Sequence, residues 1–235
     1  LGHYPRPTPM FQIPGADLSS LVVSPHSHRG RFITFEGLDG CGKSTQMEKL
    51  ASVLRAQGLP VVVTREPGGT AFGDRMRAAF VATGASVDPL AEAFALNASR
   101  AQLVVEVIEP ALREGSWVLC DRFTTATLAY QGFGRGLDLA VLRELGSIAT
   151  RGVEPDCILL LDIPVALSRT RVAARVAASG IGKDRLERED DGFHQRVRDG
   201  YLQLASEDAR IHALDGTLSP EELVRAAWGQ IESLR

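Results

Sequence analysis

The 235-residue sequence has only three cysteines and three lysines, and it contains no long hydrophobic run. Cys41, Cys120 and Cys157 are an odd number without metal-ligand spacing, which argues against a disulfide framework or a zinc site. The most apolar segment, residues 157–167, is interrupted by an aspartate and a proline, and a membrane span needs roughly 20 apolar residues. The first residues lack the basic-then-apolar order of a secretory signal. We therefore expect a cytoplasmic protein without a membrane partner.

Neither sign of charge is in large excess. The chain has 26 basic and 29 acidic residues and a formal net charge of -3, so nothing predicts a polyanionic partner such as DNA or RNA. Because nearly all basic residues are arginine, a lysine inside a motif has more weight than usual. The length and the hydrophobic fraction of 44% suffice for one domain with a substantial core.

The first 29 residues differ from the rest of the chain. They contain five of the twelve prolines and three of the five histidines, and no helical or strand-like hydrophobic period runs through them. This composition predicts a poorly ordered N-terminal tail over residues 1–29. A single domain is expected over residues 30–235.

From residue 31 onward, short apolar segments alternate with helical patterns. Strands are predicted at residues 32–35, 61–64, 117–120, 157–161 and 211–214. Helices are predicted at residues 43–57, 71–82, 89–113, 124–130, 137–150, 165–178, 192–206 and 220–234. This alternation predicts an α/β fold, with a five-stranded parallel sheet covered by helices on both faces. Ligands are then expected beyond the carboxyl ends of the strands.

Residues 37–44, Gly-Leu-Asp-Gly-Cys-Gly-Lys-Ser, fit the pattern G-x-x-x-x-G-K-[ST] between a predicted strand and a predicted helix. The glycines let successive backbone N–H groups converge on phosphate oxygens, and the helix N-terminus adds positive potential. Lys43 is expected to reach the β- and γ-phosphates, and the Ser44 hydroxyl is expected to ligate Mg²⁺. The predicted ATP-binding residues are Gly37, Leu38, Asp39, Gly40, Cys41, Gly42, Lys43, Ser44 and Thr45.

The phosphate loop alone predicts only a nucleoside triphosphate site. A GTPase would need a base-reading N-K-x-D segment, which the sequence lacks. A helicase or a transporter ATPase would be longer and would have a hydrophobic strand that ends in an acidic pair. The short chain favours a small kinase.

Further segments follow the loop in a characteristic order. They are residues 64–70 (Thr-Arg-Glu-Pro-Gly-Gly-Thr), 121–123 (Asp-Arg-Phe), 129–132 (Ala-Tyr-Gln-Gly), 184–187 (Asp-Arg-Leu-Glu), 193–197 (Phe-His-Gln-Arg-Val) and 200–202 (Gly-Tyr-Leu). Together with residues 35–44, they resemble the bacterial thymidylate kinase family over nearly all of residues 31–235. The resemblance implies a P-loop nucleoside-monophosphate kinase with a short mobile lid. It also implies transfer of the γ-phosphate of ATP to dTMP in dTTP synthesis, with Mg²⁺, by a homodimer.

The resemblance also implies individual roles. Arg122 would bind the acceptor phosphate, because an arginine fork orients phosphate through two hydrogen bonds. Asp121 would bind Mg²⁺ directly or through water, and Asp39 would lie near the acceptor's 3′-hydroxyl. Arg100 would read a thymine carbonyl, and Tyr130 would lie under the sugar, although its position also suits a core tyrosine. The implied dTMP-binding residues are Asp39, Arg65, Glu66, Pro67, Leu96, Arg100, Arg122, Thr127, Tyr130 and Gln131.

Some thymidylate kinases have an arginine inside the phosphate loop, and this sequence has none. The missing positive charge is expected from the lid, at about residues 171–190. Arg171 and Arg175 are four residues apart and share one face of a helix. Closure over ATP would bring one of these arginines to the γ-phosphate and exclude water. The predicted catalytic residues are Lys43, Arg122, Asp39, Arg171 and Arg175.

The sequence departs from the family pattern around the base. Leu96 replaces the usual aromatic residue four positions before Arg100, and Phe94 points some 200° away on the same helix. Ser99 replaces an acidic residue, and Ala126 replaces a serine. Two alternatives therefore stay open: a kinase for another pyrimidine (deoxy)nucleotide, and a degenerate nucleotide-binding protein of the same fold.

Overall fold

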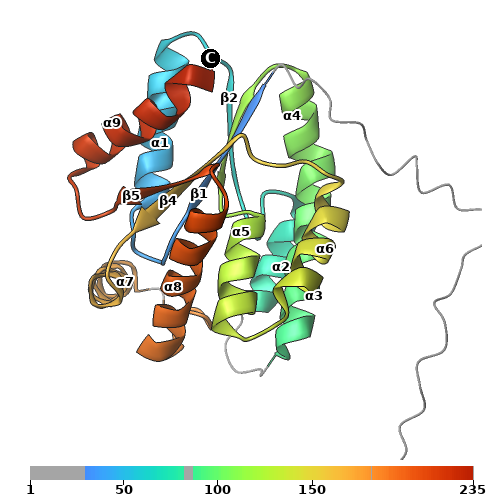
Figure 1. The fold of residues 1–235 in the computed structure, drawn as a ribbon, viewed down its shortest axis with the longest axis vertical. Coiled ribbons are helices and arrows are strands. Elements are labelled where there is room, and N and C mark those ends of the chain that lie inside the picture. The colour runs from blue at the N-terminus through green and yellow to red at the C-terminus, as the bar shows by residue number, and fades with distance from the viewer. Residues whose placement is uncertain (1–29, 82–86, 181, 235) are drawn as a thin grey trace, which may run out of the picture.

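The computed structural model describes residues 30–81, 87–180 and 182–234, so the predicted tail at residues 1–29 lies outside the described part. Five strands form one parallel sheet with the spatial order β2-β3-β1-β4-β5 (Figure 1). The strands are β1 (Arg31–Glu36), β2 (Val61–Arg65), β3 (Trp117–Asp121), β4 (Cys157–Asp162) and β5 (Ile211–Asp215). The predicted fold is confirmed, and each strand lies within one residue of its predicted limits.

The pleat of β1 divides its side chains between the two faces of the sheet, because successive residues of a strand point in opposite directions. Ile33 and Phe35 pack in the cluster formed with α1 (Lys43–Ala56) and α9 (Pro220–Ile231). Phe32 packs in the cluster on the opposite face. Thr34 and Glu36 share the parity of Phe32, and both are fully buried. The last residue of β1 is therefore a carboxylate inside the protein, next to the phosphate loop.

Helices α1 and α9 cover the first face. The leucines Leu50 and Leu54 of α1 have no exposed surface, and each fully buried leucine stabilises the fold by roughly 1.5–3 kcal/mol. Helix α9 begins with the predicted capping box, in which Ser219 and Glu222 bond to each other's backbone N–H groups. A 3-10 turn, η4 (Glu232–Leu234), follows it.

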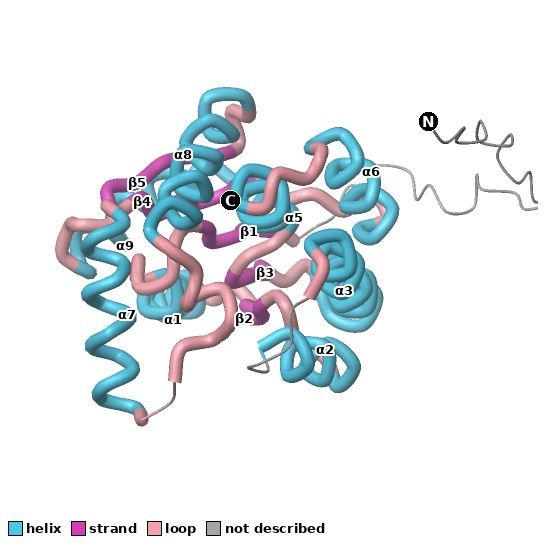
Figure 2. Tube along the Cα trace, turned by 90° about the horizontal axis from the view of Figure 1, so that it is seen from below, coloured by secondary structure: helices cyan, strands magenta, loops and turns pink. Residues whose placement is uncertain are grey.

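Helices α3, α5 and α8 cover the second face. Figure 2 shows the strands between these helices on one side and α1, α7 and α9 on the other. Helices α2 and α6 flank α3, one on each side. The bounds are α2 (Ala71–Val81), α3 (Pro89–Leu103), α5 (Thr124–Thr127), α6 (Leu139–Thr150), α7 (Val165–Ser179) and α8 (Asp191–Glu207).

The helix predicted at residues 89–113 contains a π-helical turn. Helix α3 continues through η2 (Val104–Ile108) into α4 (Glu109–Arg113). Pro110 has no N–H to donate to the carbonyl four residues earlier, and the wider turn lies directly before it. A second π-helical segment, η3 (Leu128–Gly134), extends α5 and contains two predicted site residues. Among the described residues, no helix combines the length and the apolar character that crossing a membrane requires.

Candidate active site

The phosphate loop joins the carboxyl end of β1 to the N-terminus of α1, where the sequence predicts it. Gly37, Gly40 and Gly42 have φ angles of 128°, 75° and 100°, which glycine adopts without a steric penalty. The Nζ atom of Lys43 donates to the carbonyl oxygens of Gly37 at 3.1 Å and Leu38 at 3.0 Å. A cavity of about 370 Å³ lies at this loop, and Lys43, Ser44 and Thr45 line it. The junction therefore has room for phosphate groups beside backbone N–H groups.

Two predicted loop residues point into the protein. The side chains of Leu38 and Cys41 are 2% and 1% exposed. They can therefore offer a nucleotide only their backbone atoms. All three cysteines are free and buried.

Helix α7 supports the phosphate loop from outside. The Ser168 hydroxyl donates to the carbonyl oxygen of Asp39 at 2.6 Å. The Nη1 atom of Arg171 lies 3.3 Å from the carbonyl oxygens of both Gly40 and Gly216. Arg175 instead lines the phosphate cavity, and its Nη2 lies 2.6 Å from the Glu187 carboxylate. Of the two predicted lid arginines, the structure brings Arg175 to the cavity and binds Arg171 to backbone carbonyls.

Arg122 follows β3 in an unusual backbone conformation. Its φ angle is 70°, which costs a non-glycine residue on the order of 1–3 kcal/mol. Its backbone N–H donates to Phe35 O at 2.9 Å. Its guanidinium contacts the carboxylate of Asp39 at 2.7 Å, the hydroxyl of Tyr130 at 3.1 Å and that of Tyr201 at 3.2 Å. These contacts hold the strained residue in one orientation.

Glu36 accepts hydrogen bonds from two groups that lie next to Arg122. Its Oε1 accepts from the backbone N–H of Phe123 at 2.9 Å, and its Oε2 accepts from the Tyr201 hydroxyl at 2.8 Å. Burial raises the pKa of Glu36 to about 7, although the charge of Arg122 and the bond from Tyr201 lower it. Neither Glu36 nor Tyr201 was among the site residues predicted from the sequence. The sequence did contain a signal for Glu36, which is a glutamate at the end of a mostly apolar strand. Carboxylates are almost never buried without partners, so this position could have been recognised as one with specific contacts.

Asp39 has the opposite electrostatic environment. Burial alone would raise its pKa, but the charges of Arg122 and Lys43 outweigh burial and lower the pKa to about 2. The carboxylate is therefore ionised throughout the physiological range. It lines both the phosphate cavity and the neighbouring pocket.

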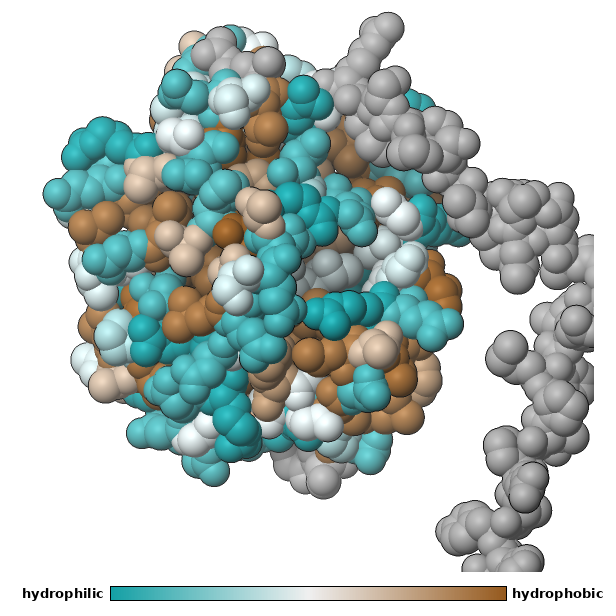
Figure 3. Space-filling model, in the orientation of Figure 1, coloured by the Kyte–Doolittle hydropathy of each residue, from teal (hydrophilic) through white to brown (hydrophobic). Residues whose placement is uncertain are grey.

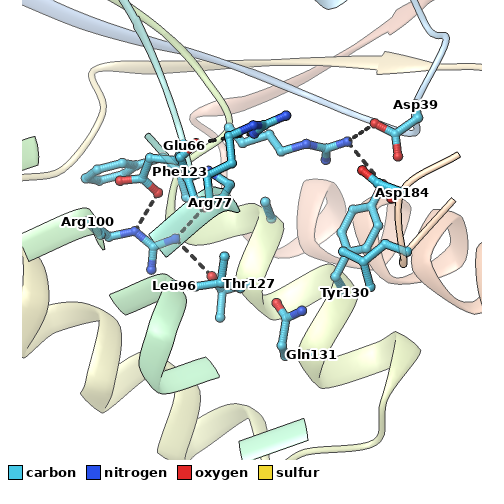
Figure 4. Close-up of a pocket in the computed structure, with 14 residues that line it drawn as sticks. Asp39, Glu66, Arg77, Leu96, Arg100, Phe123, Thr127, Tyr130, Gln131 and Asp184 are labelled. Carbon is cyan, nitrogen blue, oxygen red and sulfur yellow. Dashed lines mark hydrogen bonds and ion pairs between the residues drawn. The ribbon is translucent and has the colours of Figure 1, made fainter. Parts of the chain in front are cut away.

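The neighbouring pocket, called here the acceptor pocket, lies between the ends of β2 and β3 and helices α3 and α5 (Figure 4). It contains every predicted dTMP-binding residue except Arg65, which lines the phosphate cavity and pairs with Asp74 at 3.2 Å. The structure adds residues that the sequence analysis missed: Arg77, Phe123, Ala126, Asp184 and Leu186. Arg77 lies on α2, and no local motif marked it.

Arg100 lies at one side of the acceptor pocket and is 2% exposed. Its Nε donates to Glu66 at 2.8 Å, its Nη1 to Asn97 at 2.9 Å, and its Nη2 to Phe123 O at 3.1 Å and Thr127 at 2.9 Å. A guanidinium has five N–H donors, so one on Nη1 remains. Burial raises the pKa of Glu66 to about 7, even though the charge of Arg100 lowers it.

The three departures from the family pattern have plain structural counterparts. Leu96 lines the acceptor pocket, whereas Phe94 is 52% exposed and points away, as its spacing predicts. The Ser99 hydroxyl accepts from the backbone N–H of Gly68 at 3.2 Å, so it supports the turn after β2. Ala126 lines the pocket and leaves that wall aliphatic.

Gln131 lies on η3 at the lower side of the acceptor pocket in Figure 4 and is 1% exposed. Its Nε2 donates to the buried carboxylate of Glu92 at 2.5 Å. Its Oε1 has no hydrogen-bond partner within the described residues. Glu92 was not predicted from the sequence, because no local pattern distinguishes it from the other acidic residues in the first turns of helices.

Two oxygen-bearing residues at the phosphate loop fit a magnesium ion. The hydroxyl of Ser44 lies 3.4 Å from Oδ2 of Asp121, and Oδ1 of Asp121 is buried with no partner in the described part of the chain. Residues 30–81, 87–180 and 182–234 contain no group of three or more histidine, cysteine or acidic side chains suited to a metal. Mg²⁺ suits such a sparse site, because it takes its other ligands from substrate phosphates and water.

Comparisons with known proteins agree with this architecture. A family profile described as thymidylate kinase matches residues 35–227. The thymidylate kinase of Geobacter sp. (strain M21) is 52% identical over 191 residues, which cover 80% of this chain and 85% of that protein. The enzyme of Trichlorobacter lovleyi is 48% identical over 198 residues and is covered to 93%. A solved thymidylate kinase from Ehrlichia chaffeensis superposes with a TM-score of 0.67 at 30% identity, covering 88% of this chain and 99% of that one. By its profile, its sequence relatives and its fold, this chain belongs to the thymidylate kinase family.

Proposed function

We propose that this chain transfers the γ-phosphate of ATP to dTMP, giving dTDP and ADP. The observation that supports this reaction best is that the phosphate cavity and the acceptor pocket adjoin. Five residues line both cavities: Asp39, Glu66, Arg77, Arg122 and Asp184. A donor phosphate and an acceptor phosphate would therefore meet beside the two arginines of this set. An arginine at that point neutralises charge and aligns the attacking oxygen.

Phosphoryl transfer depends mainly on positioning and on neutralising negative charge. Lys43 and the loop N–H groups would bind the β- and γ-phosphates, and Arg122 would bind the acceptor phosphate. Ser44 and Asp121 would hold Mg²⁺, which when bound supplies further neutralisation at the phosphate oxygens. Arg175 would move from Glu187 toward the γ-phosphate. Residues 171–190 would therefore act as a lid over ATP.

The acceptor pocket presents a pattern that suits thymine. Arg100 retains one N–H donor on Nη1, and Gln131 offers an unpaired carbonyl oxygen. Thymine has a carbonyl acceptor beside its ring N–H donor. Cytosine has a ring acceptor and an amino donor in these places, so it would leave a buried polar group unpaired. Leu96 would pack on the ring as an aliphatic surface, without the stacking term of about 0.5–1.5 kcal/mol.

A homodimer is supported by exposed apolar side chains on helices α2, α3 and α6. Phe72 on α2, Leu90 and Phe94 on α3, and Val141 and Ile148 on α6 are between 41% and 69% exposed. Figure 3 shows hydrophobic surface on the side where Figure 1 draws these helices. A second copy that covers this surface would remove apolar area from water.

The three buried thiols support the cytoplasmic location, which stays a prediction.

A coupled assay of ADP release tests the proposed reaction across dTMP, dUMP, dCMP, UMP and thymidine. We expect the highest kcat/KM with dTMP and at least about a 100-fold lower value with dCMP, because of the unpaired polar groups. Preferred turnover of another monophosphate would support the alternative pyrimidine kinase. ATP binding without turnover of any acceptor would support the degenerate nucleotide-binding protein.

A further inference from the structure

Glu92 is a completely buried carboxylate that the proposed reaction does not use. It lies in the first turn of α3, is 0% exposed, and does not line the acceptor pocket. A buried carboxylate is stable only when other groups satisfy its charge and its hydrogen-bonding capacity. Its surroundings therefore show what this charge does.

Three side chains surround Glu92. Gln131 Nε2 donates to its Oε1 at 2.5 Å, and Arg185 Nη2 lies 2.5 Å from its Oε2. Arg135 Nη2 lies 3.6 Å from Oε2, and the same atom is 2.7 Å from Glu189. We call Glu92, Gln131, Arg135 and Arg185 the Glu92 cluster. This one carboxylate joins α3 to η3 and to the segment of residues 182–190.

The first consequence concerns the orientation of the Gln131 amide. The oxygen and nitrogen of an amide have the same shape but opposite hydrogen-bonding roles, so contacts decide which atom points where. An ionised carboxylate can only accept, so only the NH₂ group of Gln131 can face Glu92. The Gln131 oxygen, which is buried and unpaired among the described residues, is then left for the acceptor pocket. Glu92 thus decides that Gln131 is an acceptor toward a ligand.

The second consequence concerns the wall of the acceptor pocket. Asp184 and Leu186 line that pocket, and Arg185 between them is bound to Glu92. Arg135 holds Glu189 at the other end of the same segment. The carboxylate that orients Gln131 therefore also holds residues 184–189 against the pocket.

We propose that Glu92 is a positioning residue for acceptor recognition, which fixes the Gln131 amide as an acceptor and holds residues 182–190 over the bound base. The proposal rests on the proposed function, because it assigns the Gln131 oxygen to the ring N–H of thymine. Recognition of the base and formation of the pocket wall then depend on a single buried charge.

Glu92→Gln tests the first half of the proposal. The substituted side chain has nearly the same shape, but its amide can donate as well as accept, so the Gln131 amide is free to turn its NH₂ group toward the base. We expect kcat/KM for dTMP to fall by about 10- to 100-fold, because the NH₂ donor of Gln131 would then face the ring N–H donor of thymine and a buried polar group would be left unpaired. The loss for dCMP should be at least about tenfold smaller, and the KM for ATP should stay within about twofold. Equal losses for dTMP and dCMP would show a purely structural role and overturn the proposal.

Arg185→Met tests the second half, because it frees the segment while leaving the contact between Glu92 and Gln131 in place. We expect a higher KM for dTMP, an unchanged preference for dTMP over dCMP, and faster hydrogen exchange in residues 182–190. Unchanged hydrogen exchange in residues 182–190 would refute the claim that Glu92 holds this segment against the pocket. This test does not depend on whether Glu92→Gln folds. Asp162→Asn is the matched control, because it breaks the pair with Arg198 at 2.7 Å, away from the acceptor pocket.

The wild-type protein, measured in parallel, separates this proposal from the proposed function. Wild-type turnover of dTMP tests the reaction itself, whereas the ratio between variant and wild type tests Glu92. If the wild type prefers another monophosphate, the proposed function fails. The exchange of residues 182–190 in Arg185→Met still decides whether the Glu92 cluster holds the segment.

Discussion

The buried carboxylate of Glu36 predicts an unusual dependence of stability on pH. Glu36 is 0% exposed, and burial raises its pKa from 4.5 to about 7. A group whose pKa is raised by folding binds its proton more tightly in the native state. Ionisation of Glu36 therefore favours the unfolded chain as the pH rises above 4.5, and the loss levels off above pH 7. Glu36→Gln removes this ionisation and keeps the shape of the side chain.

The magnitude follows from the two pKa values. Their difference of about 2.5, at about 1.4 kcal/mol for each pKa unit, corresponds to about 3 kcal/mol. The free energy of unfolding of Glu36→Gln, relative to wild type, should therefore rise by about 3 kcal/mol between pH 4.5 and pH 7.5. The substituted amide can still accept from Phe123 and donate to Tyr201, so the change with pH is the informative quantity. Other titrating groups are common to both proteins and cancel in the difference.

Urea unfolding of both proteins at several pH values between 4.5 and 8 measures this difference. Glu114→Gln, which replaces an exposed glutamate by the same amide, is the matched control. A flat difference for Glu36→Gln would mean that the carboxyl titrates normally. A difference that falls with pH would mean that Arg122 and Tyr201 dominate over burial, and either result would refute the reasoning.

Three further substitutions probe the site. Lys43→Ala should abolish transfer while the unfolding midpoint stays close to wild type, since among the described residues Lys43 bonds only to loop carbonyls and a thiol. Near-normal ADP release would remove the loop from the mechanism. Arg100→Ala should raise the KM for dTMP more than the KM for ATP. It should also destabilise the protein by about 3–5 kcal/mol, because Glu66 loses its buried partner. An unchanged unfolding midpoint would contradict this loss of stability. Arg175→Ala should lower kcat by on the order of 10³-fold with little change in stability, because the Arg175 side chain is 52% exposed and the buried carboxylate of Glu187 keeps the backbone N–H of Asp184 as a partner. An undiminished kcat would mean that this arginine does not act on the γ-phosphate.

Local sequence patterns were enough to predict the strands, the phosphate loop and most helix ends. These features depend on local patterns: apolar runs, a glycine pattern between strand and helix, and a capping box at Ser219. Even the outward direction of Phe94 followed from helical spacing, and it is 52% exposed. The base-pocket residues were found through the family resemblance, because their separation along the chain hides their proximity.

The partners of the buried charges could not be predicted in this way, because they come from distant parts of the chain. Glu36 bonds to Tyr201 across 165 positions, Arg100 to Glu66 across 34, and Arg185 to Glu92 across 93. These pairs depend on the strand order and on how α3, η3 and α8 pack over the second face of the sheet. The same packing put Arg175 in the phosphate cavity and bound Arg171 to loop carbonyls, although both lie on one helix face. A local pattern fixes the direction of a side chain, but its partner is set by whichever distant element the fold packs against it.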